Sequence, residues 1–141
     1  RLDGVTGVQT CALPIYFMKR FMLGAPLQVK RFMKWHELNE PGVKYVGESG
    51  FDRSRAGSLN HPQKGFVSSY AMVDPLEDRA EVFAAMMVVQ ERMMLDRWMC
   101  SDEVLKRKVA EIHAYVTELD EHFWEWAVPG DAPPLAKAYR K

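Results

Sequence analysis

The segment Ala80–Val89 is apolar at every position except Glu81. A helix that is hydrophobic on all faces is a buried helix, so this segment is predicted to lie in the core of the fold. Burying an isolated carboxylate is costly, and Glu81 must therefore be paired with a cation, bound to a metal ion or protonated. Glu77 lies one helical turn earlier on the same face, where like charges repel. The simplest cationic partner is an Arg or Lys from elsewhere, with Glu77 completing an Asp-x-x-Glu capping pattern that starts at Asp74.

Two long helices are predicted, so the fold is expected to be mainly α. The first covers about 75–98, with Asp74 as N-cap and Pro75 at the first helical position, both of which are favoured there. The second covers about 101–126 and has Asp102 and Glu103 in its first turn, where acidic side chains favour the helix dipole. An amphipathic stripe predicts its buried face. The stripe consists of Val104, Leu105, Val109, Ile112, Val116, Leu119, Phe123 and Trp126.

The region before these helices is less regular. Residues 35–65 are polar and rich in turn-forming residues, and they show no sustained period of 2 or 3.6. We predict a long irregular loop, and such loops inside a compact domain tend to be functional or mobile. Phe66–Met72 is predicted to be a short strand or extended segment. Residues 16–34 are predicted to form two short helical pieces with a break at Pro26.

Residues 1–15 are attributed to translated DNA rather than to a natural protein. Val5–Ile15 reads as the in-frame translation of a common short-read sequencing adapter, and a chance match over that many consecutive codons is negligible. A short amphipathic strand over Val5–Leu13 is the alternative. We therefore divide the chain into an adapter-derived segment (1–15), a partial domain (16–128) and a tail (129–141). The natural sequence before about Tyr16 is expected to be missing.

Composition excludes several classes of partner. The chain has 19 Lys and Arg against 19 Asp and Glu, so it has no net basic charge for nucleic acid or an anionic membrane. No apolar run approaches the roughly 20 residues that span a bilayer. Cys11 belongs to the adapter segment, and Cys100 alone cannot form an internal disulfide or a sulfur-rich zinc site. Cys100 is predicted to be a small buried hydrophobe near a helix end.

Two stretches of the sequence carry a distinctive pattern of residues. The downstream stretch is Phe66–Ala71 followed by Glu77–Ala84, in which Tyr70 precedes a Glu-x-x-Ala-Glu pattern by seven residues. This stretch resembles zinc metallopeptidases of the gluzincin type, and is similar to zinc-binding metallopeptidases of bacteria and fungi and to the catalytic domain of anthrax lethal factor. The upstream stretch resembles the Trp-x-x-Leu-Asn-Pro-Gly-x-x-Tyr segment that such proteins carry after their zinc helix. Its matching residues are Trp35, Leu38, Asn39, Gly42 and Tyr45.

The resemblance implies that the chain is the C-terminal helical subdomain of a zincin-like α+β fold. It implies that Glu77 is the third zinc ligand and that Glu81 orients a zinc-bound imidazole. Tyr70 would be the phenol that stabilises the developing oxyanion, or donates a proton, during attack by zinc-bound water. The intact parent would then contain zinc and hydrolyse a peptide or protein substrate. Zinc and two imidazoles would also provide the positive charge that Glu77 and Glu81 require.

The sequence departs from this family in one respect. None of the four histidines is spaced as in HExxH, and the stretch His36–Glu40 begins like that motif but ends in Glu. The chain as given is expected to lack the general base and two of the three ligands, to bind no zinc and to show no peptidase activity. Truncation explains this more simply than degeneration. The alternatives are a pseudo-peptidase that keeps the fold without zinc, and a non-enzymatic helical interaction module in which Glu77 and Glu81 pair with a basic partner side chain.

Overall fold

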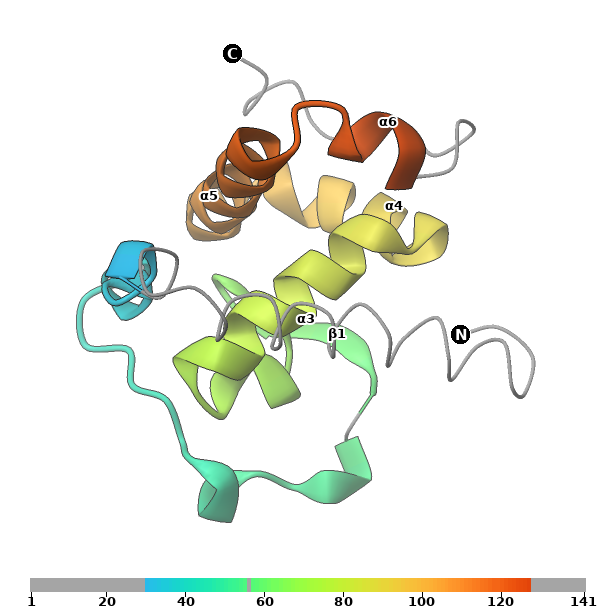
Figure 1. Cartoon of the computed structure of the whole chain (residues 1–141). Coiled ribbons are helices and arrows are strands. Elements are labelled where there is room, and N and C mark those ends of the chain that lie inside the picture. The colour runs from blue at the N-terminus through green and yellow to red at the C-terminus, as the bar shows by residue number, and fades with distance from the viewer. Residues whose placement is uncertain (1–29, 56, 128–141) are drawn as a thin grey trace.

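The structure is a computed structural model that describes residues 30–55 and 57–127 (Figure 1). The adapter segment 1–15 and the 129–141 tail lie outside these residues, as do residues 16–29 of the region predicted to form two helical pieces; of its remainder, residues 30–31 are helical and 32–34 form a turn. The described part is mostly helical, which confirms the mainly α prediction.

Each of the two predicted long helices is in fact two helices, so the predicted bounds 75–98 and 101–126 are wrong. The first consists of α3 (Pro75–Met87) and α4 (Val89–Met99), separated by Val88 in an extended conformation with φ −102° and ψ 123°. Val88 is β-branched and only 5% exposed, so an extended backbone suits it and its side chain stays in the core. Because this segment is apolar on all sides, its periodicity could not indicate where the chain turns.

The second predicted helix consists of α5 (Glu103–Leu119) and α6 (Phe123–Ala127). The break is at Asp120, which is extended and whose carboxylate accepts a hydrogen bond from the backbone N–H of His122 at 2.9 Å. Such local bonds compete with the helical pattern. At the other end Asp102 is the N-cap rather than a first-turn residue, and its side chain accepts from the N–H of Leu105 at 2.8 Å.

The predicted irregular loop contains short 3-10 helices and one strand that the sequence did not predict. The 3-10 helices are η1 (Trp35–Leu38), η2 (Glu48–Gly50) and η3 (Arg53–Arg55). Strand β1 (Leu59–Gln63) pairs antiparallel with β2 (Phe66–Ser68), and its polar sequence with Pro62 gave no strand pattern. The strand predicted at Phe66 is confirmed, whereas Tyr70–Met72 forms the 3-10 helix η4.

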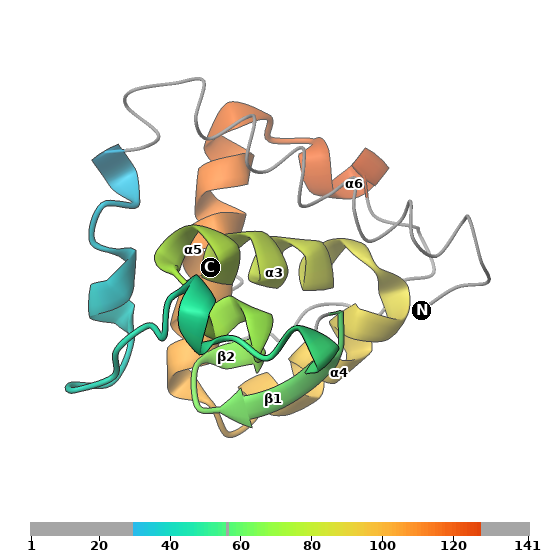
Figure 2. The same cartoon turned by 90° about the horizontal axis from the view of Figure 1, so that it is seen from below.

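Helix α3 lies at the centre of the fold. It contacts η4, β2, α4 and α5, so it is covered by the hairpin on one side and by the later helices on the others (Figures 1 and 2). The largest fully buried apolar side chains of this core are those of Phe66, Phe83, Met86, Leu95, Met99, Leu105 and Ile112.

No helix within the described ranges is long and apolar enough to cross a bilayer.

Cys100 does not take the buried position predicted for it. It follows the last residue of α4 and its side chain is exposed, while the preceding Met99 is fully buried. The thiol donates to the carbonyl oxygen of Asp96 at 3.4 Å. Helical spacing turns Cys100 away from the core that Met99 fills.

The start of α3 follows the prediction and offers a first test. Asp74 is the N-cap, and its Oδ1 accepts from the N–H groups of Leu76 at 2.7 Å and Glu77 at 2.8 Å. Asp74→Ala removes both acceptors and is expected to lower the free energy of unfolding by about 1 kcal/mol. Urea denaturation followed by circular dichroism measures this loss. Asp74→Asn, which keeps an acceptor oxygen, should retain most of the stability, and equal losses for the two variants would contradict the cap's role.

Candidate functional site

The structure brings Tyr70, Glu77 and Glu81 together. Tyr70 begins η4 and is partly buried, whereas Glu77 and Glu81 are 6% and 4% exposed on α3. The Tyr70 phenol lies close to the Glu77 carboxylate, and both Glu77 and Glu81 act electrostatically on the phenol. Burial, together with the interaction with Glu77, raises the pKa of Tyr70 well above its ordinary value of 10.0. Tyr70 is therefore a neutral hydrogen-bond donor throughout the physiological pH range.

Glu81 has a neighbour that sequence reasoning missed. The Ser68 hydroxyl, at the end of β2, donates to Oε2 of Glu81 at 2.7 Å and accepts from the N–H of Ala71 at 3.0 Å. Ser68 and Glu81 are both buried, and a hydrogen bond to a buried carboxylate is strong. This contact fixes one oxygen of Glu81 against the segment that carries Tyr70. The Ser68-Ser69-Tyr70 sequence was noted only as part of the family resemblance.

A cleft of about 440 Å³ opens beside Tyr70. Its lining combines an apolar base with an ion pair at the surface, in which Arg53 lies 3.6 Å from Glu48. The Phe51 ring contacts the Tyr70 ring edge-on, with centroids 5.2 Å apart. The chain just before η2 is hydrogen-bonded to the end of η4. The N–H of Val46 donates to the carbonyl oxygen of Met72 at 2.9 Å, and the N–H of Gly47 donates to that of Val73 at 3.0 Å. The lining residues are Glu48, Phe51, Arg53, Tyr70 and Val73.

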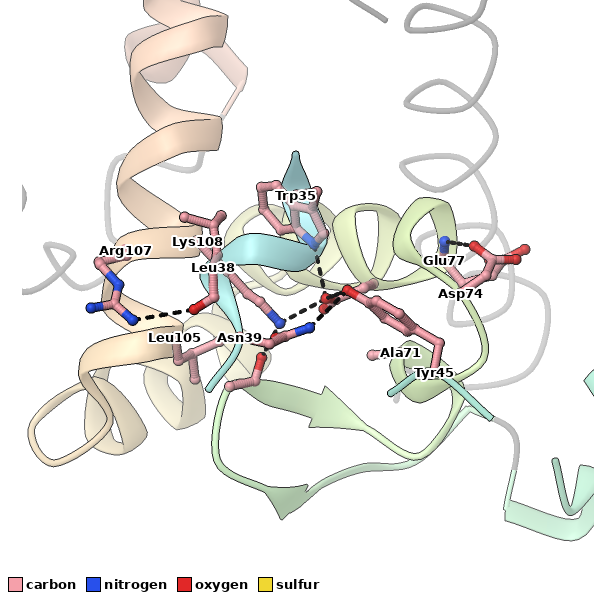
Figure 3. A network of polar contacts seen from close by, with 12 residues as sticks. Trp35, Leu38, Asn39, Tyr45, Ala71, Asp74, Glu77, Leu105, Arg107 and Lys108 are labelled. Carbon is pink, nitrogen blue, oxygen red and sulfur yellow. Dashed lines mark hydrogen bonds and ion pairs between the residues drawn. The ribbon is translucent and has the colours of Figure 1, made fainter. Parts of the chain in front are cut away.

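On an adjacent face of α3, Asp78 is the centre of a buried polar cluster that the sequence analysis did not single out. Its Oδ2 accepts from Trp35 Nε1 at 2.8 Å, from the Tyr45 hydroxyl at 2.7 Å and from Lys108 Nζ at 2.7 Å. Asn39 donates to the Tyr45 hydroxyl at 3.2 Å. Figure 3 shows these side chains converging from η1, the following loop and α5. We call these five residues the Asp78 cluster.

The Asp78 cluster places a charged pair in the core. Asp78 and Lys108 are both 0% exposed, and Lys108 Nζ also lies 4.1 Å from the centre of the Phe66 ring. Burial raises the pKa of Asp78 and lowers the pKa of Lys108, because each charged form loses its hydration, and the attraction between them opposes both shifts. One signal could have found Lys108: it lies among the stripe residues of α5, three positions after Leu105 and one before Val109.

The cluster explains what the upstream stretch does in this chain. Three of the residues that resemble the gluzincin segment, Trp35, Asn39 and Tyr45, belong to it. They attach the loop to α3 at the residue that follows Glu77. The two stretches that carry the resemblance are therefore in contact, and the upstream one supports the helix that carries the two predicted site carboxylates.

The described residues do not make a zinc site by themselves. No three His, Cys, Asp or Glu side chains within residues 30–55 and 57–127 are grouped so that they could hold a metal ion. Glu77 and Glu81 lie on one helical face with a phenol and a serine hydroxyl beside them.

Comparison with known proteins returns no match. No family model, no curated protein and no solved structure matches this chain. The interpretation of the site therefore depends on the residues and their geometry.

The interaction between the Tyr70 phenol and the Glu77 carboxylate can be tested by titration. Glu77→Gln removes a negative charge beside the phenol, so the pKa of Tyr70 is expected to fall towards 10.0 while part of the shift, caused by burial, remains. Ultraviolet absorbance of phenolate, with Tyr70→Phe as the reference that removes this signal, measures the change. An unchanged Tyr70 titration would contradict the contact.

The raised pKa of Tyr70, caused mainly by burial, also predicts a pH dependence of stability. The pKa of Tyr70 is higher in the folded chain than in the unfolded chain. The stability that the protonated phenol contributes is therefore fully present below about pH 10 and is lost as the pH rises further. Tyr70→Phe should therefore reduce the alkaline loss of stability. Glu103→Gln, at an exposed position of α5, is the control and should leave it unchanged.

Proposed function

We propose that this chain is part of a zinc-dependent peptidase of the gluzincin type, in which it provides the C-terminal helical subdomain of a zincin-like fold. The proposal assigns Glu77 as a zinc ligand, Glu81 as the carboxylate that orients a zinc-bound imidazole, and Tyr70 as the donor to the substrate carbonyl oxygen. The substrate would be a peptide or protein. An HExxH helix of the parent would supply two imidazoles and the general base.

One observation supports the proposal above the others. The phenol of Tyr70 lies close enough to the carboxylate of Glu77 for the two to interact, although they come from different elements and were paired only by the sequence resemblance. A neutral phenol held beside a potential ligand suits hydrogen-bond donation to a developing oxyanion. Ser68 holds Glu81 one turn further along α3. The cleft beside Tyr70 offers space for a substrate side chain.

Zinc, when bound in such a site, would activate water for attack on the peptide carbonyl. The residues of this chain would hold the remaining parts in place. The Asp78 cluster attaches the beginning of α3 to η1, and the Ser68 hydroxyl holds the Glu81 carboxylate by a hydrogen bond. The backbone bonds of Val46 and Gly47 hold the segment before η2 against η4, next to the cleft. Substitution of any of these supports would disturb the position of the carboxylates without removing them.

The first experiment is to sequence the source DNA upstream of the Tyr16 codon and to express the recovered parent. The parent is expected to contain HExxH and to bind one zinc ion per chain, measured by elemental analysis. Glu77→Gln should lose the metal. Tyr70→Phe should keep the metal and lower kcat by about 100- to 1,000-fold, as the loss of one oxyanion donor does elsewhere.

Two results would refute the proposal. The first is an upstream sequence without HExxH, which would favour a pseudo-peptidase or an interaction module. The second is a parent that retains full zinc content and peptidase activity when Glu77 is Gln. Glu103→Gln is the matched control, because it removes a carboxylate from an exposed position of α5 and should leave zinc and activity unchanged.

A further inference from the structure

The turn of the β1–β2 hairpin is attached to α5 from two sides. The N–H of Gly65 donates to Oδ2 of Asp102 at 2.6 Å, and the carbonyl oxygen of Gly65 accepts from Lys108 Nζ at 2.7 Å. The same Oδ2 of Asp102 lies 2.8 Å from Nε2 of His61, on strand β1. One carboxylate oxygen therefore binds both the strand and the turn. We call His61, Gly65 and Asp102 the hairpin clasp.

His61 is held in a conformation that its backbone does not favour. Its φ is 44°, and within the described part of the chain it is the one residue other than glycine with a positive φ. Such a conformation is uncommon for a residue with a side chain and persists where the surroundings enforce it. Here the imidazole stacks on the Trp98 ring with centroids 4.9 Å apart, while its Nε2 meets Asp102. The side chain is 24% exposed and so remains open to solvent protons.

Asp102 has further partners besides His61 and Gly65, and among them is Lys108, whose pKa is lowered by burial. Its Oδ1 accepts from the N–H of Leu105, and the ammonium groups of Lys64 and Lys108 act on it electrostatically. Burial opposes its ionisation, but the bonds from Gly65, Leu105 and His61 prevail and lower the pKa of Asp102. The lowered pKa favours the ionised form of Asp102, and histidine is the side-chain type whose charge changes between about pH 5 and pH 8.

We propose that the hairpin clasp is pH-sensitive: protonation of His61 strengthens the attachment of the β1–β2 hairpin to Asp102, the N-cap of α5. A hydrogen bond between an imidazolium and a carboxylate is roughly twice as strong as one made by a neutral donor. Protonation adds this strength at β1, and the shared Oδ2 couples it to the turn at Gly65. Deprotonation leaves a neutral imidazole in a strained backbone conformation and so loosens the hairpin.

A change in the strength of the hairpin clasp affects the segment that carries part of the candidate site. Strand β2 follows the turn directly and ends at Ser68, which bonds to Glu81, and η4 begins at Tyr70. A looser turn therefore allows more motion of Ser68 and Tyr70 relative to α3. The inference does not depend on the proposed peptidase function, because it concerns the hairpin alone.

Amide hydrogen exchange of the 141-residue chain, followed by NMR, tests whether the hairpin clasp depends on pH. The reporter is the Gly65 N–H, which bonds to Asp102 directly, and its rate is expressed relative to the rate of an unfolded chain at the same pH. Protection of this amide is expected to be about fivefold higher at about pH 5 than at about pH 8. The midpoint of the change should coincide with the titration of the His61 ring protons.

Two variants separate His61 from other titrating groups. In His61→Gln the side-chain amide can still donate to Asp102 but does not titrate, so the protection should become independent of pH. His36→Gln, at an exposed position of η1, is the matched control and should behave like the original chain. A flat pH profile in the original chain, or an unchanged profile in His61→Gln, would overturn the proposal. If His61→Gln fails to fold, the original chain alone still tests the proposal: coinciding midpoints of Gly65 protection and of the His61 ring protons support it, and different midpoints overturn it.

Discussion

Lys108→Met is expected to lower the free energy of unfolding by about 3–5 kcal/mol, because it leaves the Asp78 carboxylate buried without its cation. The two side chains are 2.7 Å apart and both are fully buried. Methionine fills a similar volume, so the loss reflects charge rather than a cavity. Urea denaturation at neutral pH measures the effect. For a small domain a loss of this size is a large fraction of the total stability.

Two further variants identify the cause. Lys106→Met removes a half-buried lysine from the same helix, where it pairs with Glu103 at the surface, and should change the stability by less than about 1 kcal/mol. The double variant Asp78→Asn, Lys108→Met removes both charges while an amide oxygen still accepts from Trp35 and Tyr45. It should recover most of the loss. A double variant as unstable as Lys108→Met would show that the uncompensated charge is not the cause, and that packing or the lost bond to the Gly65 carbonyl oxygen is.

Gly65→Ala is expected to destabilise the protein by about 2–4 kcal/mol, the sum of backbone strain and overpacking. The φ of Gly65 is 87°, which disfavours any side chain, and an added Cβ would lie 2.5 Å from Cγ1 of Val104. The substitution would push the hairpin turn away from α5 and weaken the bonds to Asp102 and Lys108. Thermal unfolding monitored by circular dichroism should show a clear fall in Tm.

Gly42 separates the two contributions. It has the same φ of 87°, but an added Cβ meets no atom within 4 Å. Gly42→Ala should therefore show the backbone strain alone, about 1–2 kcal/mol. Combining Gly65→Ala with Val104→Ala removes the clashing atom and should restore part of the stability difference between the two glycine variants. Equal losses at Gly42 and Gly65 would mean that the close contact with Val104 has no energetic consequence.

The sequence predicted the helical character of the fold and the start of α3, because caps and amphipathic spacing are local signals. The breaks at Val88 and Asp120 were missed for different reasons. Val88 lies in a segment that is apolar on all sides, so no face indicated a turn. Asp120 ends a helix through its bond to His122, which is only one of several local conformations open to an aspartate.

Tyr70, Glu77 and Glu81 were selected through a family resemblance, and their roles stay a prediction. The structure places Tyr70 at the start of η4 near Glu77 of α3, with Glu81 one turn further along that helix. The burial of Glu81 was predicted from its apolar neighbours alone. Asp78 and Lys108 were not selected, since their pairing joins α3 to α5 and no local pattern specifies it. Strand β1 was missed because its residues are mostly polar and its pairing with β2 is irregular.

The Asp78 cluster also has a consequence for which parts of the chain depend on one another. Its bonds join residues 43, 33 and 30 positions apart in the chain, so none of them can form within a single helix or turn. The stability that the cluster contributes is therefore shared by η1, the loop that carries Tyr45, α3 and α5, and removing any one of these segments leaves polar groups of the others in the core without their partners.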